Sequence, residues 1–144
     1  MKRLVMALAL LLGLGLAFSP MVYAKGMKTK GDLVKEATAQ IKEVTPAEAK
    51  GMIGKSGTVL IDCREPSEFE AGHIPGAVNI PRGLLEFKIE EKVPDRKTKI
   101  IVYCRTGGRA SLACCSLIGM GYENIVSIQG GWMAWEKAGL PVEK

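Results

Sequence analysis

Four short apolar runs constrain the fold of this 144-residue chain most strongly. They are rich in Val and Ile, they alternate with stretches of helical character, and they cover residues 58–61, 77–80, 99–103 and 124–128. Strands that are apolar throughout are typical of parallel sheets buried on both faces. The pattern therefore predicts an α/β fold, a doubly wound parallel sheet with helices on both faces and right-handed crossovers.

Before, between and after the strands we expect six helices, at residues 32–43, 45–51, 65–71, 83–89, 110–120 and 131–138. Asp32 is a suitable N-cap for the first helix, and Pro46 is allowed in the first turn of the second. The chain shows no internal repeat. Its length after the N-terminal segment suits one ordinary domain.

Residues 1–24 have the pattern of a secretory signal peptide. Lys2 and Arg3 precede an apolar stretch of 15 residues, Leu4–Phe18, and small residues lead to a cleavage site after Ala24. The apolar stretch is shorter than the roughly 18–20 residues of a membrane-spanning helix. We expect a periplasmic or secreted protein with no stable membrane span in its mature form, and an uncleaved anchor remains the alternative.

Charge and composition exclude other classes. The formal net charge is +5, and removal of Lys2 and Arg3 lowers it by two. The remaining basic residues are scattered, so we expect no nucleic-acid partner. The chain has four cysteines but no C-x-x-C pair, and its only histidine is His73. We therefore expect no disulfide scaffold, no metal site and no cofactor, with Cys114 and Cys115 packed in a helix.

One loop carries the chemistry. It reads Cys104, Arg105, Thr106, Gly107, Gly108, Arg109 and lies between an expected strand and an expected helix. Backbone N–H groups of such a loop and the N-terminus of the helix stabilise an anion. The pKa of a cysteine placed there falls well below its free value of about 8.5. Cys104 is the predicted nucleophile, and the glycines supply backbone conformations that other residues avoid.

Three chemistries use a cysteine in such a loop. Cysteine phosphatases need an arginine six residues after the cysteine, whereas here Ala110 occupies that place and Arg109 lies five residues on. Dithiol exchange usually needs a second cysteine where Thr106 stands. Sulfur transfer, in which the thiolate attacks a sulfane sulfur and the amides hold a persulfide, needs neither. The sequence also lacks a nucleotide P-loop motif.

Several ordered motifs resemble the single-domain rhodanese family in an exported form. They are the loop at 104–109, Asp62–Glu65, Gly72–Pro81, Gly130–Trp132 and Ala138–Pro141. The resemblance implies a rhodanese-like domain, which we place at residues 41–144, after a polar segment and N-terminal helix at residues 25–40. It also implies a Cys104 persulfide and, through Arg105, thiosulfate as the donor. Arg105 and Arg109 would supply positive charge to that dianion.

The expected function is transfer of sulfane sulfur from thiosulfate, or a similar donor, to a thiophilic acceptor. Cyanide, a thiol or a thioredoxin-like protein would take the sulfur. The alternative is a persulfide carrier without turnover that binds a partner protein.

Residues near the loop have expected supporting roles. We interpret Asp62 and Arg64 as an ion pair that braces the rim, His73 as part of a structural turn, and Trp132 and Trp135 as packing residues. Cys63 departs from the family pattern. It follows a strand end next to the loop, so it is either a small buried residue or a resolving thiol for Cys104.

Overall fold

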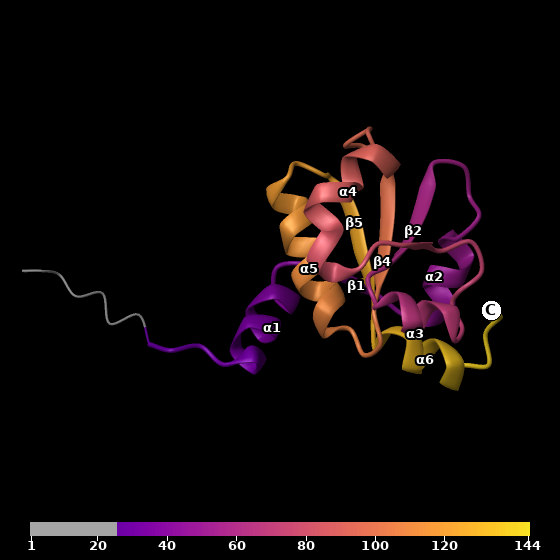
Figure 1. The fold of residues 1–144 in the computed structure, drawn as a ribbon, viewed down its shortest axis with the longest axis horizontal. Coiled ribbons are helices and arrows are strands. Elements are labelled where there is room, and N and C mark those ends of the chain that lie inside the picture. Colours follow the sequence, from indigo (N-terminus) through magenta and orange to yellow (C-terminus); the bar gives the residue numbers. More distant parts are fainter. Residues whose placement is uncertain (1–25) are drawn as a thin grey trace, which may run out of the picture.

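Five parallel strands form the centre of the fold, and helices cover both of their faces (Figure 1). The computed structural model describes residues 26–144. In chain order the elements are α1 (Lys30–Thr38), β1 (Lys42–Val44), α2 (Pro46–Met52), β2 (Thr58–Asp62), α3 (Pro66–Glu70), β3 (Val78–Asn79), the 3-10 turn η1 (Arg82–Leu84), α4 (Leu85–Lys92), β4 (Lys99–Tyr103), α5 (Gly108–Gly119), β5 (Asn124–Ile128) and α6 (Gly131–Lys137). The predicted α/β fold with a doubly wound parallel sheet is confirmed.

The central strand β4 shows why the sheet is buried on both faces. Ile100 and Val102 belong to a core cluster with residues of α4 and α5, whereas Ile101 and Tyr103 belong to a second cluster with residues of α2 and α6. Successive side chains of a strand point to opposite faces. The apolar residues at positions 100–103 therefore fill both clusters, as the sequence pattern predicts.

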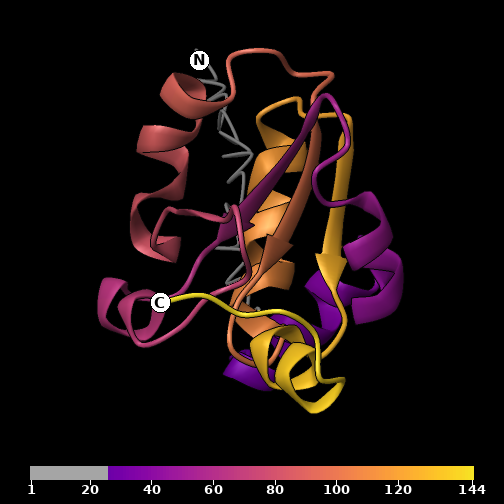
Figure 2. The same cartoon turned by 90° about the vertical axis from the view of Figure 1, so that its right-hand side faces the viewer.

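The strand order positions the site. It is β1-β5-β4-β2-β3, so β4 lies between β5 and β2. Figure 2 shows the strand arrowheads at the same end of the sheet, where α6 also lies. In open parallel sheets ligands bind beyond the carboxyl ends of the strands. The loop that begins at Cys104 starts at this end.

Two predicted helix boundaries are wrong. The first helix ends at Thr38 and not at residue 43, because Lys42 pairs with Val126 of β5 and makes β1 a strand. It also begins earlier: Thr29 is its N-cap, and the Asp32 carboxylate accepts a hydrogen bond from the Thr29 N–H at 2.8 Å. A three-residue strand has too few positions for a periodic signal, so its pairing partner decides its conformation.

The predicted signal peptide at residues 1–24 lies outside the described residues. Within residues 26–144, no helix is long and apolar enough to cross a membrane.

Two neighbouring residues of α5 test the packing of the core. Leu117 is fully buried, whereas Ile118 is 46% exposed. We expect Leu117→Ala to lower the free energy of unfolding by about 2–5 kcal/mol, because it leaves a cavity. The matched control, Ile118→Ala, costs less than about 1 kcal/mol. Urea unfolding followed by circular dichroism measures both, and equal losses would contradict the assigned face of α5.

Candidate active site

The two central strands bring two cysteines together. The parallel register pairs Asp62 with Tyr103, and the Cys63 N–H continues the ladder by donating to the Tyr103 carbonyl oxygen at 2.9 Å. Cys63 and Cys104 are thus the next opposite positions, both buried, in one core cluster. The two side chains influence each other, since the Cys63 thiol lowers the Cys104 pKa and the Cys104 sulfur raises the Cys63 pKa.

Backbone N–H groups surround that sulfur. Gly107 has a φ of +104°, which favours glycine, and its N–H donates to Cys104 Sγ at 3.1 Å. The N–H groups of Thr106 and Ala110 also lower the pKa of the Cys104 thiol. Ala110 was not among the predicted amides of residues 105–109. It lies in the first turn of α5, where N–H groups have no partner within the helix.

The N-terminus of α6 holds the outer side of the loop. The Trp132 N–H donates to the Cys104 carbonyl at 2.7 Å, and the Met133 N–H donates to the Arg105 carbonyl at 3.1 Å. A Cβ atom on Gly131 would lie 2.3 Å from the Cys104 carbonyl oxygen. With these carbonyls turned toward α6, the loop N–H groups are left to face inward.

This environment favours the Cys104 thiolate. The hydrogen bond from Cys63, followed by those from the N–H groups of Ala110, Thr106 and Gly107, lowers the Cys104 pKa to about 5 against the opposing effect of burial. Cys63 shifts the other way, since contact with the Cys104 sulfur and burial both raise its pKa. The opposite shifts favour the form in which Cys104 is the thiolate and Cys63 remains a thiol.

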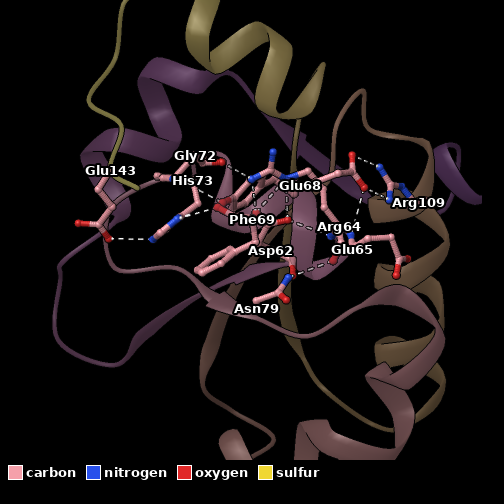
Figure 3. Close-up of polar contacts among 12 residues, drawn as sticks. Asp62, Arg64, Glu65, Glu68, Phe69, Gly72, His73, Asn79, Arg109 and Glu143 are labelled. Atoms are coloured by element: carbon pink, nitrogen blue, oxygen red, sulfur yellow. Dashed lines mark hydrogen bonds and ion pairs between the residues drawn. The ribbon is translucent and has the colours of Figure 1, made fainter.

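Arg109 of the loop forms an ion pair with Glu68, an acid that the sequence pattern did not indicate as a site residue. Its Nη1 lies 2.7 Å from Glu68 Oε2 and its Nη2 lies 2.9 Å from Glu68 Oε1 (Figure 3). The hydrogen bond from Arg109 is the largest cause of the low Glu68 pKa, about 2. The paired guanidinium lines the same cavity as Cys104.

Arg105 and Cys104 do not line the same cavity. Arg105 is exposed and lines a cavity of about 510 Å³ together with Arg64 and Trp132. Cys104 lines a different cavity, of about 610 Å³, with Thr106, Gly108, Arg109 and residues of α1. Of the two predicted loop cations, the structure therefore brings Arg109 and not Arg105 to the cavity of the nucleophile.

Asp62 and Arg64 form a buried ion pair beside the loop. Arg64 Nη2 lies 2.6 Å from Asp62 Oδ2 and also donates to the Gly72 carbonyl at 2.7 Å (Figure 3). The guanidinium lies over the Trp132 ring at 4.6 Å from its centroid. The close contact between the two charges, together with their hydrogen bonds, offsets the cost of removing them from water. It ties the end of β2 to the start of α6.

His73 stabilises a turn at some remove from the sulfur. Its ring stacks on Phe69, and its two nitrogens lie 3.0 Å from the Phe69 carbonyl and 3.2 Å from Glu143 Oε1 (Figure 3). It therefore joins α3 to the C-terminal segment. Trp135 is buried, and its Nε1 donates to the Pro141 carbonyl at 2.8 Å.

The arrangement suits nucleophilic chemistry at sulfur. A buried thiolate that accepts from the Gly107 N–H can attack a second sulfur atom and then hold it as an anion beside the N–H groups of the loop. All four cysteines are free thiols. Among residues 26–144, no three His, Cys, Asp or Glu side chains are grouped to hold a metal ion.

Comparisons with known proteins agree on one family. Residues 45–138 match the family described as Rhodanese-like domain. A sulfurtransferase of Allochromatium vinosum is 37% identical over 84 residues, which cover 58% of this chain and 77% of that protein. Thiosulfate sulfurtransferase GlpE of Pseudoalteromonas translucida is 32% identical over 97 residues, which cover 67% of this chain and 90% of that protein.

A solved structure supports the fold. A protein of unknown function from Rhodopseudomonas palustris, described as a possible tyrosine phosphatase, is similar with a TM-score of 0.72 and 35% identity. The match covers 82% of this chain and 96% of that protein.

Substitution of Gly131, at the start of α6, and of Gly139, just after its end, tests how the loop is held. Gly131 and Gly139 both have positive φ, +58° and +64°, so alanine strains either backbone by about 1 kcal/mol or more. Only Gly131→Ala also forces a Cβ into the Cys104 carbonyl oxygen. We expect Gly131→Ala to raise the pH midpoint of Cys104 alkylation by iodoacetamide above about 5, because the N–H groups of the loop would no longer point toward the Cys104 sulfur. Mass mapping of the Cys104 peptide measures it. Gly139→Ala is the control, and an equal shift in both variants would contradict the role of α6.

Proposed function

The chain belongs to the rhodanese family of sulfurtransferases, and from that premise we propose that it is a thiosulfate sulfurtransferase with Cys104 as nucleophile. The observation that carries the proposal is the position of Cys104 directly after β4, in a loop where the Gly107 N–H donates to its sulfur at 3.1 Å. The Cys63 thiol and the neighbouring backbone N–H groups lower its pKa to about 5. A thiolate at neutral pH needs no general base. This agrees with the structural place of His73, which contacts Phe69 and Glu143 instead.

The first half-reaction loads the site. The Cys104 thiolate attacks the outer sulfur of thiosulfate, the S–S bond of thiosulfate breaks, and sulfite leaves with the bonding electron pair. The product is a Cys104 persulfide anion. The N–H groups that hold the thiolate also suit that anion, with Gly107 and Ala110 on the side of α5.

Positive charge near the loop favours an anionic donor. Arg109 lines the cavity of Cys104 while Glu68 fixes its guanidinium in a bidentate pair. Arg105 is exposed next to the loop, where it would meet the donor on its approach. Thr106, Gly107 and Gly108 contribute backbone and not side-chain chemistry. Asp62 and Arg64 would support the loop indirectly through Trp132.

In the second half-reaction an acceptor removes the sulfur. Cyanide serves in the assay, and a thiol or a thioredoxin-like protein is the proposed acceptor in the cell. A carrier that holds the persulfide for a partner protein would perform only the first half-reaction. A phosphatase activity, by contrast, would need a loop one residue longer, because Ala110 stands where an arginine would be needed to wrap a phosphoryl group.

We also propose export. The supporting observation is the signal-peptide pattern of residues 1–24, and it makes Cys63 relevant because an oxidising compartment promotes disulfides. There, Cys63 would act as a resolving thiol. A peroxide would oxidise the Cys104 thiolate to its sulfenic acid, with hydroxide as the leaving group. Attack of the Cys63 sulfur on that acid then forms the disulfide and releases water. Opposite positions on adjacent strands suit the short Cα–Cα separation of a disulfide.

Steady-state transfer from thiosulfate to cyanide tests the function. We expect turnover by the protein and a loss of at least about a thousandfold in kcat/KM for Cys104→Ser, because the hydroxyl is not ionised. Cys115→Ser is the matched control on α5, since Cys115 lies outside the cavity of the nucleophile and a serine hydroxyl keeps a donor for the Ala37 carbonyl. It retains activity.

The intact mass of the protein, measured before and after incubation with thiosulfate, completes that experiment. A stable gain of one sulfur atom without turnover would contradict the enzyme and support the persulfide carrier. No sulfur gain and no turnover would refute sulfur transfer. An aryl phosphate is expected to remain unhydrolysed.

Substitution of Cys63 tests its two proposed roles. We expect Cys63→Ala to raise the pH midpoint of Cys104 alkylation above about 5, since it removes the largest contribution to the low Cys104 pKa. Cys63→Ser keeps a hydroxyl donor, so we expect its midpoint to lie between those of the unsubstituted protein and Cys63→Ala. Peroxide is expected to join Cys63 to Cys104 in the unsubstituted protein. If thiol mass mapping finds Cys104 oxidised while Cys63 stays free, the resolving role is refuted.

A further inference from the structure

The cavity beside Cys104 has one wall from outside the part of the chain that matches the family. That match spans residues 45–138, whereas α1 covers Lys30–Thr38. Cys104, Thr106, Gly108, Arg109 and Leu112 line the cavity on one side, and Lys30, Gly31, Val34 and Lys35 line it on the other. The segment before the matched region thus turns the surface next to the nucleophile into a cavity of about 610 Å³.

Three contacts hold α1 in this place, next to α5 (Figure 1). Val34 lies against Gly108, where a Cβ would be 3.4 Å from a Val34 methyl group. Thr38 Oγ1 donates to Ser111 Oγ at 3.0 Å, and Cys115 Sγ lies 3.6 Å from the Ala37 carbonyl. The contacts run along α5 from Gly108, directly after the catalytic loop, to Cys115. The helix is therefore docked at the site rather than merely preceding it in the chain.

The size of the cavity exceeds what the inorganic reactants need. Small organic ligands occupy pockets of roughly 300–1,000 Å³, and the cavity lies within that range. Thiosulfate and cyanide are ions of a few atoms. A second reactant of organic size would fill the remaining space.

The lining indicates the chemistry of that reactant. Lys30, Lys35 and Arg109 bring positive charge, and no acid lines the cavity. Two nearby acids of α1 are engaged elsewhere: Asp32 accepts from the Thr29 N–H, and Glu36 pairs with Lys28. Among residues 26–144, neither Lys30 nor Lys35 is in an ion pair with an acid. Val34 and Leu112 add an apolar surface between these charges.

We propose that this cavity binds the sulfur acceptor, and that the acceptor is an organic thiol with an apolar body and at least one carboxylate. The proposal rests on the proposed sulfurtransferase activity and names its acceptor class. The carboxylate would lie against Lys30 and Lys35, and the thiol would point to Cys104. Its sulfur attacks the outer sulfur of the persulfide, the bond to Cys104 Sγ breaks, and its electron pair restores the thiolate. The acceptor leaves as a persulfide with its own proton, so no oxidant or reductant is required.

Acceptor kinetics with a matched pair of probes test the proposal. Glutathione carries two carboxylates, and its diethyl ester keeps the thiol and the size without those charges. We expect the double variant Lys30→Gln, Lys35→Gln to raise the KM for glutathione roughly three- to tenfold, the scale of two exposed charge pairs. The KM values for the ester and for cyanide are expected to change less than about twofold on that scale.

The double variant Lys88→Gln, Lys92→Gln is the control, because it removes the same two charges from exposed positions of α4, away from the cavity. Both cavity lysines are exposed, so the variants should fold normally, and circular dichroism checks this. An unchanged glutathione KM, or an equal rise for glutathione and the ester, would overturn the proposal while cyanide turnover persists. Loss of cyanide turnover in the unsubstituted protein would instead refute the proposed function.

Discussion

The N-terminus of α6 determines what the reactive loop can do. A loop of six residues has as many carbonyl oxygens as N–H groups, and the carbonyls would repel a thiolate if they faced it. Here the N–H groups of Trp132 and Met133 take the carbonyls of Cys104 and Arg105. The free N–H groups of a helix end are well suited to this. Gly131 permits the approach, since any Cβ would meet the Cys104 carbonyl oxygen. The thiolate, the proposed persulfide and the low Cys104 pKa all depend on this contact.

That contact in turn needs α6 to be fixed against the sheet. The buried pair of Asp62 and Arg64 supplies one attachment, because the Arg64 guanidinium lies over the ring of Trp132. Trp135 supplies a second, deeper one in the core cluster of that face. The arginine is thus placed to orient α6, and Asp62 balances its charge. The cavity of Cys104 is lined by Arg109, whose charge Glu68 balances, and by Lys30 and Lys35, which are in no ion pair among residues 26–144.

Much of this arrangement follows from local sequence, and the rest depends on contacts between distant residues. Apolar runs predicted β2, β4 and β5 with their order of strands and helices, and the strand, cysteine and two glycines predicted the loop. The pair of Arg109 and Glu68 spans 41 residues, and Glu68 also reads as an ordinary residue in the first turn of α3. The Ala110 N–H gives no signal, since every residue but proline carries one. β1 is a strand because Val126 pairs with Lys42, which no local pattern reveals.

The order of the strands has a consequence for how the protein meets other copies of itself. The edge positions belong to β1, with three residues, and β3, with two, whereas the longer strands are interior. Edge strands offer free N–H and C=O groups to which a neighbouring chain can add its own strand, and short edges offer few. The sheet can therefore keep its most apolar strands, β4 and β5, without presenting them to another molecule. The same topology that exposes the strand ends to a ligand protects the strand sides from aggregation.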